Sequence, residues 1–176
     1  QVHRWLPVTG PTRLHTETRW IDGDTLRVVL SAWREAPKAA LSRFEPVATG
    51  HVRFADVYGK APLADRPLKN AEPAEDPYSS GALFHGPAFR YVTALAFGPA
   101  GSTATLDAGK GTVAWGTLGQ GLLDALTHAI PHDQLSRWDS RIPEDQVGYP
   151  WRIDALDLYE RLPETGEFRL EARFEG

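Results

Sequence analysis

Apolar and polar residues alternate in short runs over residues 2–54 of the chain. The clearest runs cover residues 14–20, 26–33 and 47–54. Alternation with a period of two predicts β-strands that bury one face. The sequence Asp22-Gly23-Asp24 separates the first two runs, and glycine readily adopts the positive φ of a tight turn. We therefore predict two antiparallel strands within residues 12–33 and a further strand near residues 47–54.

The alternation stops between Asp56 and Pro77, where prolines recur and bulky apolar residues are almost absent. Proline fixes φ, so such a segment is a semi-extended linker. The sequence thus predicts three parts: strands in residues 1–55, a linker over 56–77, and a larger unit over 78–176.

The larger unit combines further strands with one helix. Strand-like runs cover residues 89–97, 101–106, 151–159 and 167–174. Residues 116–131 contain the helix, since Leu122, Leu123, Leu126, Ala129 and Ile130 are apolar and Pro131 must end it. A short helix that is apolar nearly all round is typically buried. Strands, one buried helix and strands again predict the α+β class, with an antiparallel sheet wrapped around the helix.

Composition narrows the classes of function. The 176 residues carry a net charge of -4 and no cysteine. The charge disfavours nucleic acid and anionic membranes as partners, and the lack of cysteine excludes disulfides and thiolate chemistry. No apolar run is long enough to span a membrane, and no targeting segment precedes the first strands. We expect an internal piece of a longer, cytoplasmic protein.

Asp124 and His128 are the first candidates for chemistry, because residues four apart share one face of a helix. A carboxylate within an apolar helix is costly to bury unless it is partnered or protonated. One interpretation is structural: Asp124 caps or salt-bridges a group at the sheet edge, and His128 is its satisfied partner. The other is that burial raises the pKa of Asp124, which makes it a general acid that His128 orients.

Other chemistry is disfavoured. His128 and His132 have the spacing of a helical metal pair, but Pro131 breaks the helix and no third ligand is near in sequence, so we predict no metal site. His85 precedes Gly86-Pro87, which places a titratable ring beside backbone that can approach a ligand closely. Taken alone, this stretch is more often a turn with an exposed histidine.

Three motifs in order resemble a known family. They are Phe84-His85-Gly86-Pro87-Ala88-Phe89, the helix segment Leu118–Ala129, and Val147-Gly148-Tyr149-Pro150-Trp151. Together they resemble the second half of the dehydratase domains of type I polyketide synthases and, more closely, of polyunsaturated fatty acid and enediyne synthases. The resemblance implies two hot-dog folds side by side, each a sheet curled around a central helix, with the first hot dog incomplete here.

The resemblance also implies roles for single residues. Asp124 matches the catalytic aspartate and His128 its partner. The substrate-binding positions implied are His85, Gly86, Pro87, Phe89, Tyr149 and Trp151. His85 stands where the family has a tyrosine before Gly-Pro. Before Trp151, the family's Leu-Pro-Phe is replaced by Val147, Gly148, Tyr149 and Pro150.

One expected group has no counterpart. The family's general base is a histidine followed by Gly at the fourth position and Pro at the ninth. The residues four positions after the six histidines are Pro7, Arg19, Ala55, Phe89, His132 and Ser136. We therefore expect the base to lie outside this chain, or the domain to be degenerate.

The implied reaction is loss of water from a 3-hydroxyacyl thioester, held on the phosphopantetheine of an acyl carrier protein within a megasynthase. No metal or organic cofactor is implied. Two alternatives stay open: a non-catalytic acyl-binding or scaffolding module, and a hot-dog thioesterase or cyclase. Sheet edges left unpaired by missing strands favour a homodimer.

Overall fold

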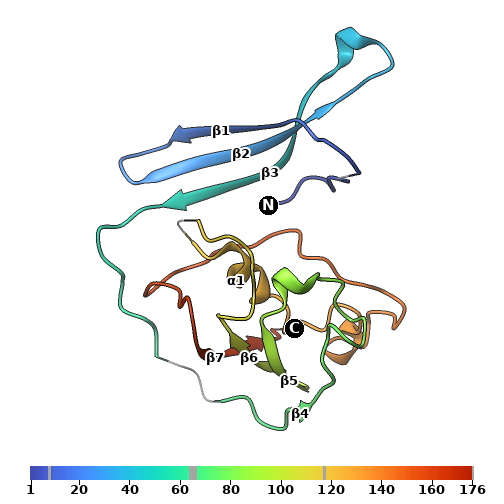
Figure 1. Ribbon diagram of the computed structural model, residues 1–176, viewed down its shortest axis with the longest axis vertical. Helices are drawn as coiled ribbons and strands as arrows, with labels where there is room; N and C mark the ends of the chain where they lie inside the picture. Colours follow the sequence, from blue (N-terminus) through green and yellow to red (C-terminus); the bar gives the residue numbers. More distant parts are fainter. Residues whose placement is uncertain (8, 64–66, 117, 176) are drawn as a thin grey trace. The chain divides into compact units, whose positions relative to one another are not determined.

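The computed structural model describes residues 1–7, 9–63, 67–116 and 118–175. The chain forms two compact units (Figure 1). The first unit comprises Gln1–Ala61 and Pro150–Tyr159, and the second comprises Pro62–Tyr149 and Glu160–Gly176. Parts of the expected linker (residues 64–66), of the expected helix segment (Thr117) and the last residue lie outside the described residues.

The first unit contains an antiparallel sheet of order β1-β2-β3. Its strands are β1 (Leu14–Trp20), β2 (Thr25–Arg34) and β3 (Arg43–Arg53). The β1–β2 turn forms where expected, because Asp22 Oδ1 accepts hydrogen bonds from the N–H groups of Asp24 (3.1 Å) and Thr25 (2.8 Å). A short 3₁₀ helix, η1 (Ala39–Leu41), connects β2 to β3.

The second unit contains an antiparallel sheet of order β4-β5-β6-β7. Its strands are β4 (Glu72–Pro73), β5 (Val92–Gly98), β6 (Gly101–Asp107) and β7 (Glu167–Arg173). Gly101, with φ of 146°, ends the β5–β6 turn, and a Cβ atom there would stand 2.1 Å from the carbonyl oxygen of Ala172 on β7. Only glycine therefore fits the junction of these three strands.

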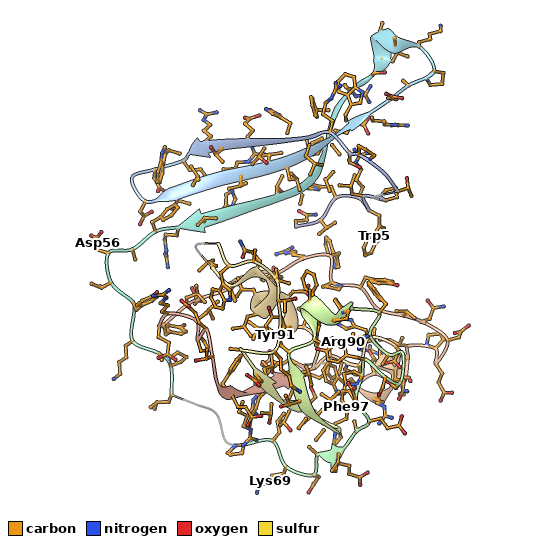
Figure 2. The ribbon with its side chains drawn as sticks, viewed as in Figure 1. Trp5, Asp56, Lys69, Arg90, Tyr91 and Phe97 are labelled. Carbon is orange, nitrogen blue, oxygen red and sulfur yellow. The ribbon has the colours of Figure 1, made fainter. Side chains whose placement is uncertain are left out.

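The helix α1 (Gln120–Ala125) packs against this sheet (Figure 1). Leu122 and Ala125 are buried in one cluster with Leu95 of β5 and Leu106 of β6. The side chains around this core are drawn in Figure 2. Two further 3₁₀ helices, η2 (Pro87–Phe89) and η3 (Leu135–Arg137), flank α1 in the sequence. The unit is a sheet packed on a central helix, as the element order predicts.

Three local predictions are corrected. The helix is shorter than residues 116–131 and is not buried all round, since Leu123 and Asp124 are only half-buried. The strand expected over 89–97 begins at Val92, because Pro87 lacks an N–H and starts η2 instead. Residues 151–159 form no strand, although their apolar residues alternate, because Trp151, Ile153 and Leu156 have no sheet to cover and are exposed.

The division into residues 1–55, 56–77 and 78–176 stays a prediction. No helix within the described ranges is long and apolar enough to cross a membrane.

Candidate functional site

The end of α1 brings Asp124 and His128 together. The chain continues past Ala125 in turns, and the N–H of His128 donates to the carbonyl of Ala125 (3.0 Å). This places His128 Nε2 3.2 Å from Asp124 Oδ2. The imidazole of His128 is fully buried, whereas the Asp124 side chain keeps 41% of its surface exposed. The partly exposed carboxylate of Asp124 therefore contacts a histidine ring that is itself fully buried.

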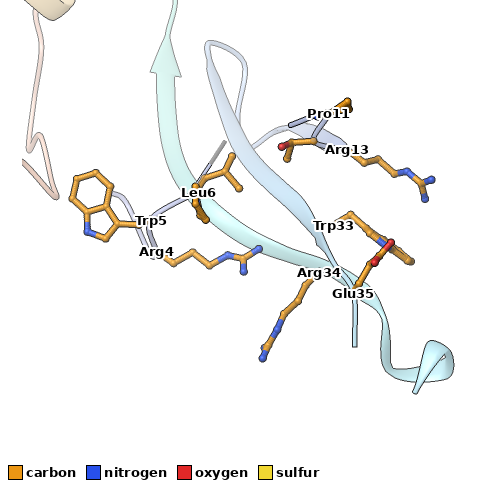
Figure 3. Close-up of a pocket in the computed structure, with 10 residues that line it drawn as sticks. Arg4, Trp5, Leu6, Pro11, Arg13, Trp33, Arg34 and Glu35 are labelled. Carbon is orange, nitrogen blue, oxygen red and sulfur yellow. The ribbon is translucent and has the colours of Figure 1, made fainter. Parts of the chain in front are cut away.

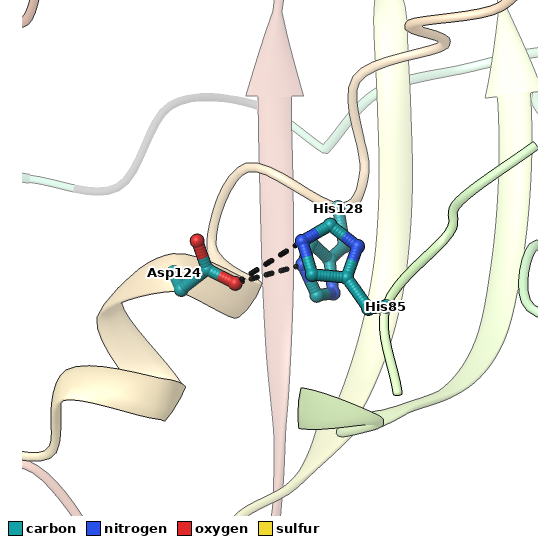
Figure 4. A group of neighbouring side chains, drawn as sticks. All are labelled: His85, Asp124 and His128. Atoms are coloured by element: carbon teal, nitrogen blue, oxygen red, sulfur yellow. Dashed lines mark hydrogen bonds and ion pairs between the residues drawn. The ribbon is translucent and has the colours of Figure 1, made fainter. Parts of the chain in front are cut away.

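His85 reaches the same carboxylate from the turn that precedes η2 (Figure 4). Its Nε2 is 3.4 Å from Asp124 Oδ2, and its ring centroid is 4.1 Å from that of His128. The backbone of this turn is fixed because Arg90 Nε donates to the carbonyl oxygen of His85 (3.1 Å). Two imidazoles thus converge on one oxygen atom.

Tyr78 determines how His128 is hydrogen-bonded. Its hydroxyl oxygen accepts the backbone N–H groups of Tyr91 and Val92, each at 3.2 Å. With its oxygen so occupied, the hydroxyl proton is the group that can face His128 Nδ1, 2.9 Å away. His128 therefore accepts at Nδ1 and donates its Nε2–H to Asp124. Both nitrogens of the ring are satisfied.

These contacts set the ionisation of Asp124. The hydrogen bond from His128 lowers the pKa of Asp124, and this effect outweighs the opposing effect of burial. The prediction of a raised pKa for Asp124 is therefore wrong: burial does raise it, but the hydrogen bond from His128 and the nearby histidines lower it by more. Asp124 is a carboxylate at neutral pH, suited to accepting hydrogen bonds and to stabilising a cation.

Burial shifts the pKa values of the neighbouring histidine and tyrosine side chains in opposite directions. Desolvation lowers the pKa of His85, although the charge of Asp124 partly opposes this. Desolvation raises the pKa of the Tyr78 and Tyr91 hydroxyls, so both remain protonated. At neutral pH the site therefore holds an anion, a neutral His85 and two phenols.

His85, Asp124 and His128 are also close enough together to be tested as metal ligands, with their nearest ligand atoms within 4.8 Å of one another. A histidine that binds a metal through Nε2 normally donates Nδ1–H to an acceptor behind it. Behind His128, however, the Tyr78 oxygen already accepts two N–H groups. His85 Nδ1 has no partner among the described residues. The groups behind both rings therefore do not fit a metal centre.

Comparison with known proteins identifies the architecture. No protein-family model and no curated protein matches the chain. Among solved structures, the bifunctional dehydratase-cyclase domain in ambruticin biosynthesis matches with a TM-score of 0.57 and 20% identity, over 100% of this chain and 62% of that one. The hot-dog fold is thereby shown: an antiparallel sheet with a central helix. The chain has the fold of a dehydratase domain.

Two other solved structures match with lower scores. The erythromycin dehydratase matches with a TM-score of 0.42 and 18% identity over 66% of this chain and 45% of that chain. A dehydratase from work on the borrelidin and fluvirucin polyketide synthases matches with 0.46 and 19% identity over 73% of this chain and 48% of that chain. The chain spans between 45% and 62% of the length of these three structures.

The hot-dog structure brings together only part of the predicted site. Gly86 caps η2, Pro87 begins it, and the Phe89 ring centroid lies 6.2 Å from that of His85, so these positions adjoin His85. Tyr149 is more than half exposed in the second unit. Trp151 belongs to the first unit, where its carbonyl oxygen accepts the N–H of Val2 (2.7 Å). The substrate-binding roles of all these residues stay predictions.

Sequence reasoning missed Tyr78 and Tyr91. Tyr78 follows the proline-rich segment, fifty positions before the histidine that it contacts. Tyr91 fills space that two glycines leave, since a Cβ on Gly111 would stand 1.9 Å from its ring and one on Gly121 2.5 Å from its hydroxyl oxygen. Gly121 lies inside the helix, where glycine is disfavoured, and this was the signal that a large side chain lies against it.

His132 is the second member of the metal pair considered above, and both of its ring nitrogens contact backbone carbonyl oxygens instead of facing His128. Its Nδ1 lies 2.9 Å from the carbonyl oxygen of Gly148 and its Nε2 lies 3.1 Å from that of Thr127. The ring connects the end of the helical segment to the loop that leads to Tyr149.

The first unit contains a cavity of about 760 Å³ lined by arginine, tryptophan and proline side chains (Figure 3). None of the predicted site residues lines it. Its Arg4 and Arg34 both pair with the single carboxylate of Glu45 on β3, at 3.4 and 3.1 Å, and Arg43 pairs with the same carboxylate. Nothing in this lining indicates a reaction.

Proposed function

We propose that this hot-dog chain is the aspartate-bearing part of a dehydratase that removes water from 3-hydroxyacyl thioesters. The observation that supports it most is the Asp124 carboxylate, held by two histidines near the C-terminal end of the central helix. A dehydratase needs such a group beside the carbon that loses its hydroxyl. The likeness of fold to a dehydratase-cyclase domain agrees with this assignment.

The contacts of Asp124 favour a particular role. Oδ2 receives both histidines, and no hydrogen bond to the described residues occupies Oδ1. The free oxygen of an ionised carboxylate accepts a hydrogen bond, so Asp124 would orient the 3-hydroxyl group rather than protonate it. Only substrates with a hydroxyl at C3 use this contact. That would give the site its selectivity between hydroxyacyl and saturated chains.

The substrate would be carried as a thioester on the phosphopantetheine of an acyl carrier protein, within a polyketide or polyunsaturated fatty acid synthase. A thioester acidifies its α-carbon, so removal of the α-proton needs only a base. The reaction therefore calls for no metal and no organic cofactor. Other domains of the synthase, and a second copy of this chain, are the further partners we propose.

The test is incubation of the chain with a 3-hydroxybutyryl thioester of a carrier protein or of pantetheine, followed by mass spectrometry. We expect a product lighter by one water, and we expect Asp124→Asn to abolish it while the fold is kept. Asp133→Asn, which alters another half-buried carboxylate of the same unit, is the matched control and should retain the activity.

Other products would assign the alternatives. Release of the free 3-hydroxy acid would identify a thioesterase, and a ring-closed product from a substrate with a second hydroxyl would identify a cyclase. Binding of the thioester without any change of mass would support an acyl-binding or scaffolding module. Each of these outcomes would contradict the dehydratase proposal.

A further inference from the structure

The two imidazoles that meet at Asp124 have different capacities to take up a proton. His128 accepts the Tyr78 hydroxyl at Nδ1 and donates from Nε2 to Asp124, so its only lone pair is in use. His85 places Nε2 beside the same carboxylate, which an unprotonated nitrogen would repel. The proton of neutral His85 therefore belongs on Nε2, and the lone pair belongs on Nδ1.

Nδ1 of His85 is buried and has no hydrogen-bond partner in the described part of the chain. Buried polar atoms are normally paired, and an unpaired one among other titratable groups indicates function. The arrangement is that of an imidazole oriented by a carboxylate through one nitrogen while the other nitrogen is kept for the reaction. Among the described groups around Asp124, His85 alone meets this requirement.

We infer that His85 is the general base of this hot-dog unit, with Asp124 as its counter-ion, so that the chain carries its own proton acceptor. The inference rests on the proposed function. It supplies a general base in place of the family's histidine, which has no counterpart in this sequence. It also changes the part that His85 plays, from contacting the substrate to reacting with it.

The reaction balances with this one residue. The proton on C2 moves to Nδ1 of His85, and the C2–H electron pair becomes the C2–C3 double bond as the C3–O bond breaks. The imidazolium then gives that same proton to the departing hydroxyl, which leaves as water. His85 is neutral at the start and at the end, and the ionised Asp124 stabilises the cation between these steps.

Access to the ring involves Phe84. Its ring stacks on His85 with centroids 5.0 Å apart and an angle of 12°, yet 81% of its own surface is exposed. A side chain that covers a neighbour while burying so little of itself is displaced at low cost. An acyl chain would therefore take the place of Phe84 against His85.

The test separates proton removal from loss of water. A saturated butyryl pantetheine thioester has no hydroxyl to lose, so exchange of its α-protons in D₂O reports the base alone. We expect the wild-type chain to incorporate deuterium, and His85→Gln to reduce the rate about 100-fold or more. His51→Gln, at an exposed position in the first unit, is the control and should exchange like the wild type.

The pH profile gives a readout that a structural role would not produce. A base must be deprotonated, and burial together with His128 and His132 lowers the pKa of His85 against the opposing charge of Asp124. Exchange should therefore rise with pH and level off, with its midpoint below 6.5. Imidazole added to His85→Gln should restore part of the rate.

The outcomes separate the two proposals. Exchange that depends on His85, without loss of water from the hydroxyacyl substrate, would keep this inference and overturn the dehydratase. Loss of water that survives His85→Gln would keep the dehydratase and overturn His85 as its base. Absence of exchange in the wild-type chain, with binding of the thioester confirmed, would also overturn the inference.

Discussion

The Tyr78 hydroxyl offers the sharpest test of the hydrogen-bond network behind the site. Tyr78→Phe removes one oxygen atom and keeps the ring, which is 8% exposed in the core. The loss leaves His128 Nδ1 and the N–H groups of Tyr91 and Val92 without the partner that they share. A buried polar group that loses its partner costs about 1–3 kcal/mol. Taking the low end for each of the three groups, we expect a loss of about 3 kcal/mol.

Urea unfolding of the two proteins measures this loss directly, and the m-value should stay constant because the same surface is exposed on unfolding. Tyr91→Phe is the matched control, since that ring is also buried but its hydroxyl makes no hydrogen bond to the described residues. It should cost less than about 1 kcal/mol. A loss below that same value for Tyr78→Phe would refute the network. Nitrogen-15 NMR gives a second check, because His128 Nδ1 should show the shift of an unprotonated nitrogen.

Three further predictions concern packing and pH. Gly121→Ala places a Cβ 2.5 Å from the Tyr91 hydroxyl oxygen, so thermal unfolding should show that the free energy of unfolding falls by about 1–3 kcal/mol. Ser102→Ala removes the buried hydroxyl that donates to the Ala129 carbonyl, and urea unfolding should show a loss of about 1–3 kcal/mol. Because folding lowers the pKa of His85, the unfolded chain takes up that proton first. The free energy of unfolding should therefore fall as the pH drops from 6.5 through the lower pKa of folded His85. Urea unfolding of the wild type and of His85→Gln should give free energies whose difference changes with pH only within that range.

Local patterns in the sequence predict most of the strands. The alternation around the Asp22 turn predicts β1 and β2 because each strand pairs with its neighbour in the chain, and the structure confirms both. The same alternation fails over residues 151–159, which form no strand. Alternation shows that a segment can form a strand, whereas strand formation also depends on a neighbouring strand to pair with.

The helix shows the same limit at its ends. Pro131 marks where no helix can continue, but α1 ends at Ala125 well before that point. Beyond Ala125 the backbone is held by tertiary contacts, since Ser102 binds the carbonyl of Ala129 and His132 binds that of Thr127. These partners come from β6 and from the loop after the helix. A sequence pattern within the helix cannot reveal them.

The aspartate and the two histidines of the site were predictable, whereas Tyr78, Tyr91 and the protonation of the site were not. Spacing alone indicates that Asp124 and His128 meet, and the resemblance of motifs adds His85. Whether Asp124 is an acid or an anion depends on the direction of one hydrogen bond. That direction is set by Tyr78, whose oxygen is occupied by two backbone N–H groups of the β5 region. The position of the Tyr78 hydroxyl therefore makes His128 donate its Nε2–H to Asp124, and this hydrogen bond favours the charged form of Asp124. Because both nitrogens of His128 are in use, His85 is left as the imidazole that can take a proton, and the sequence alone does not indicate this.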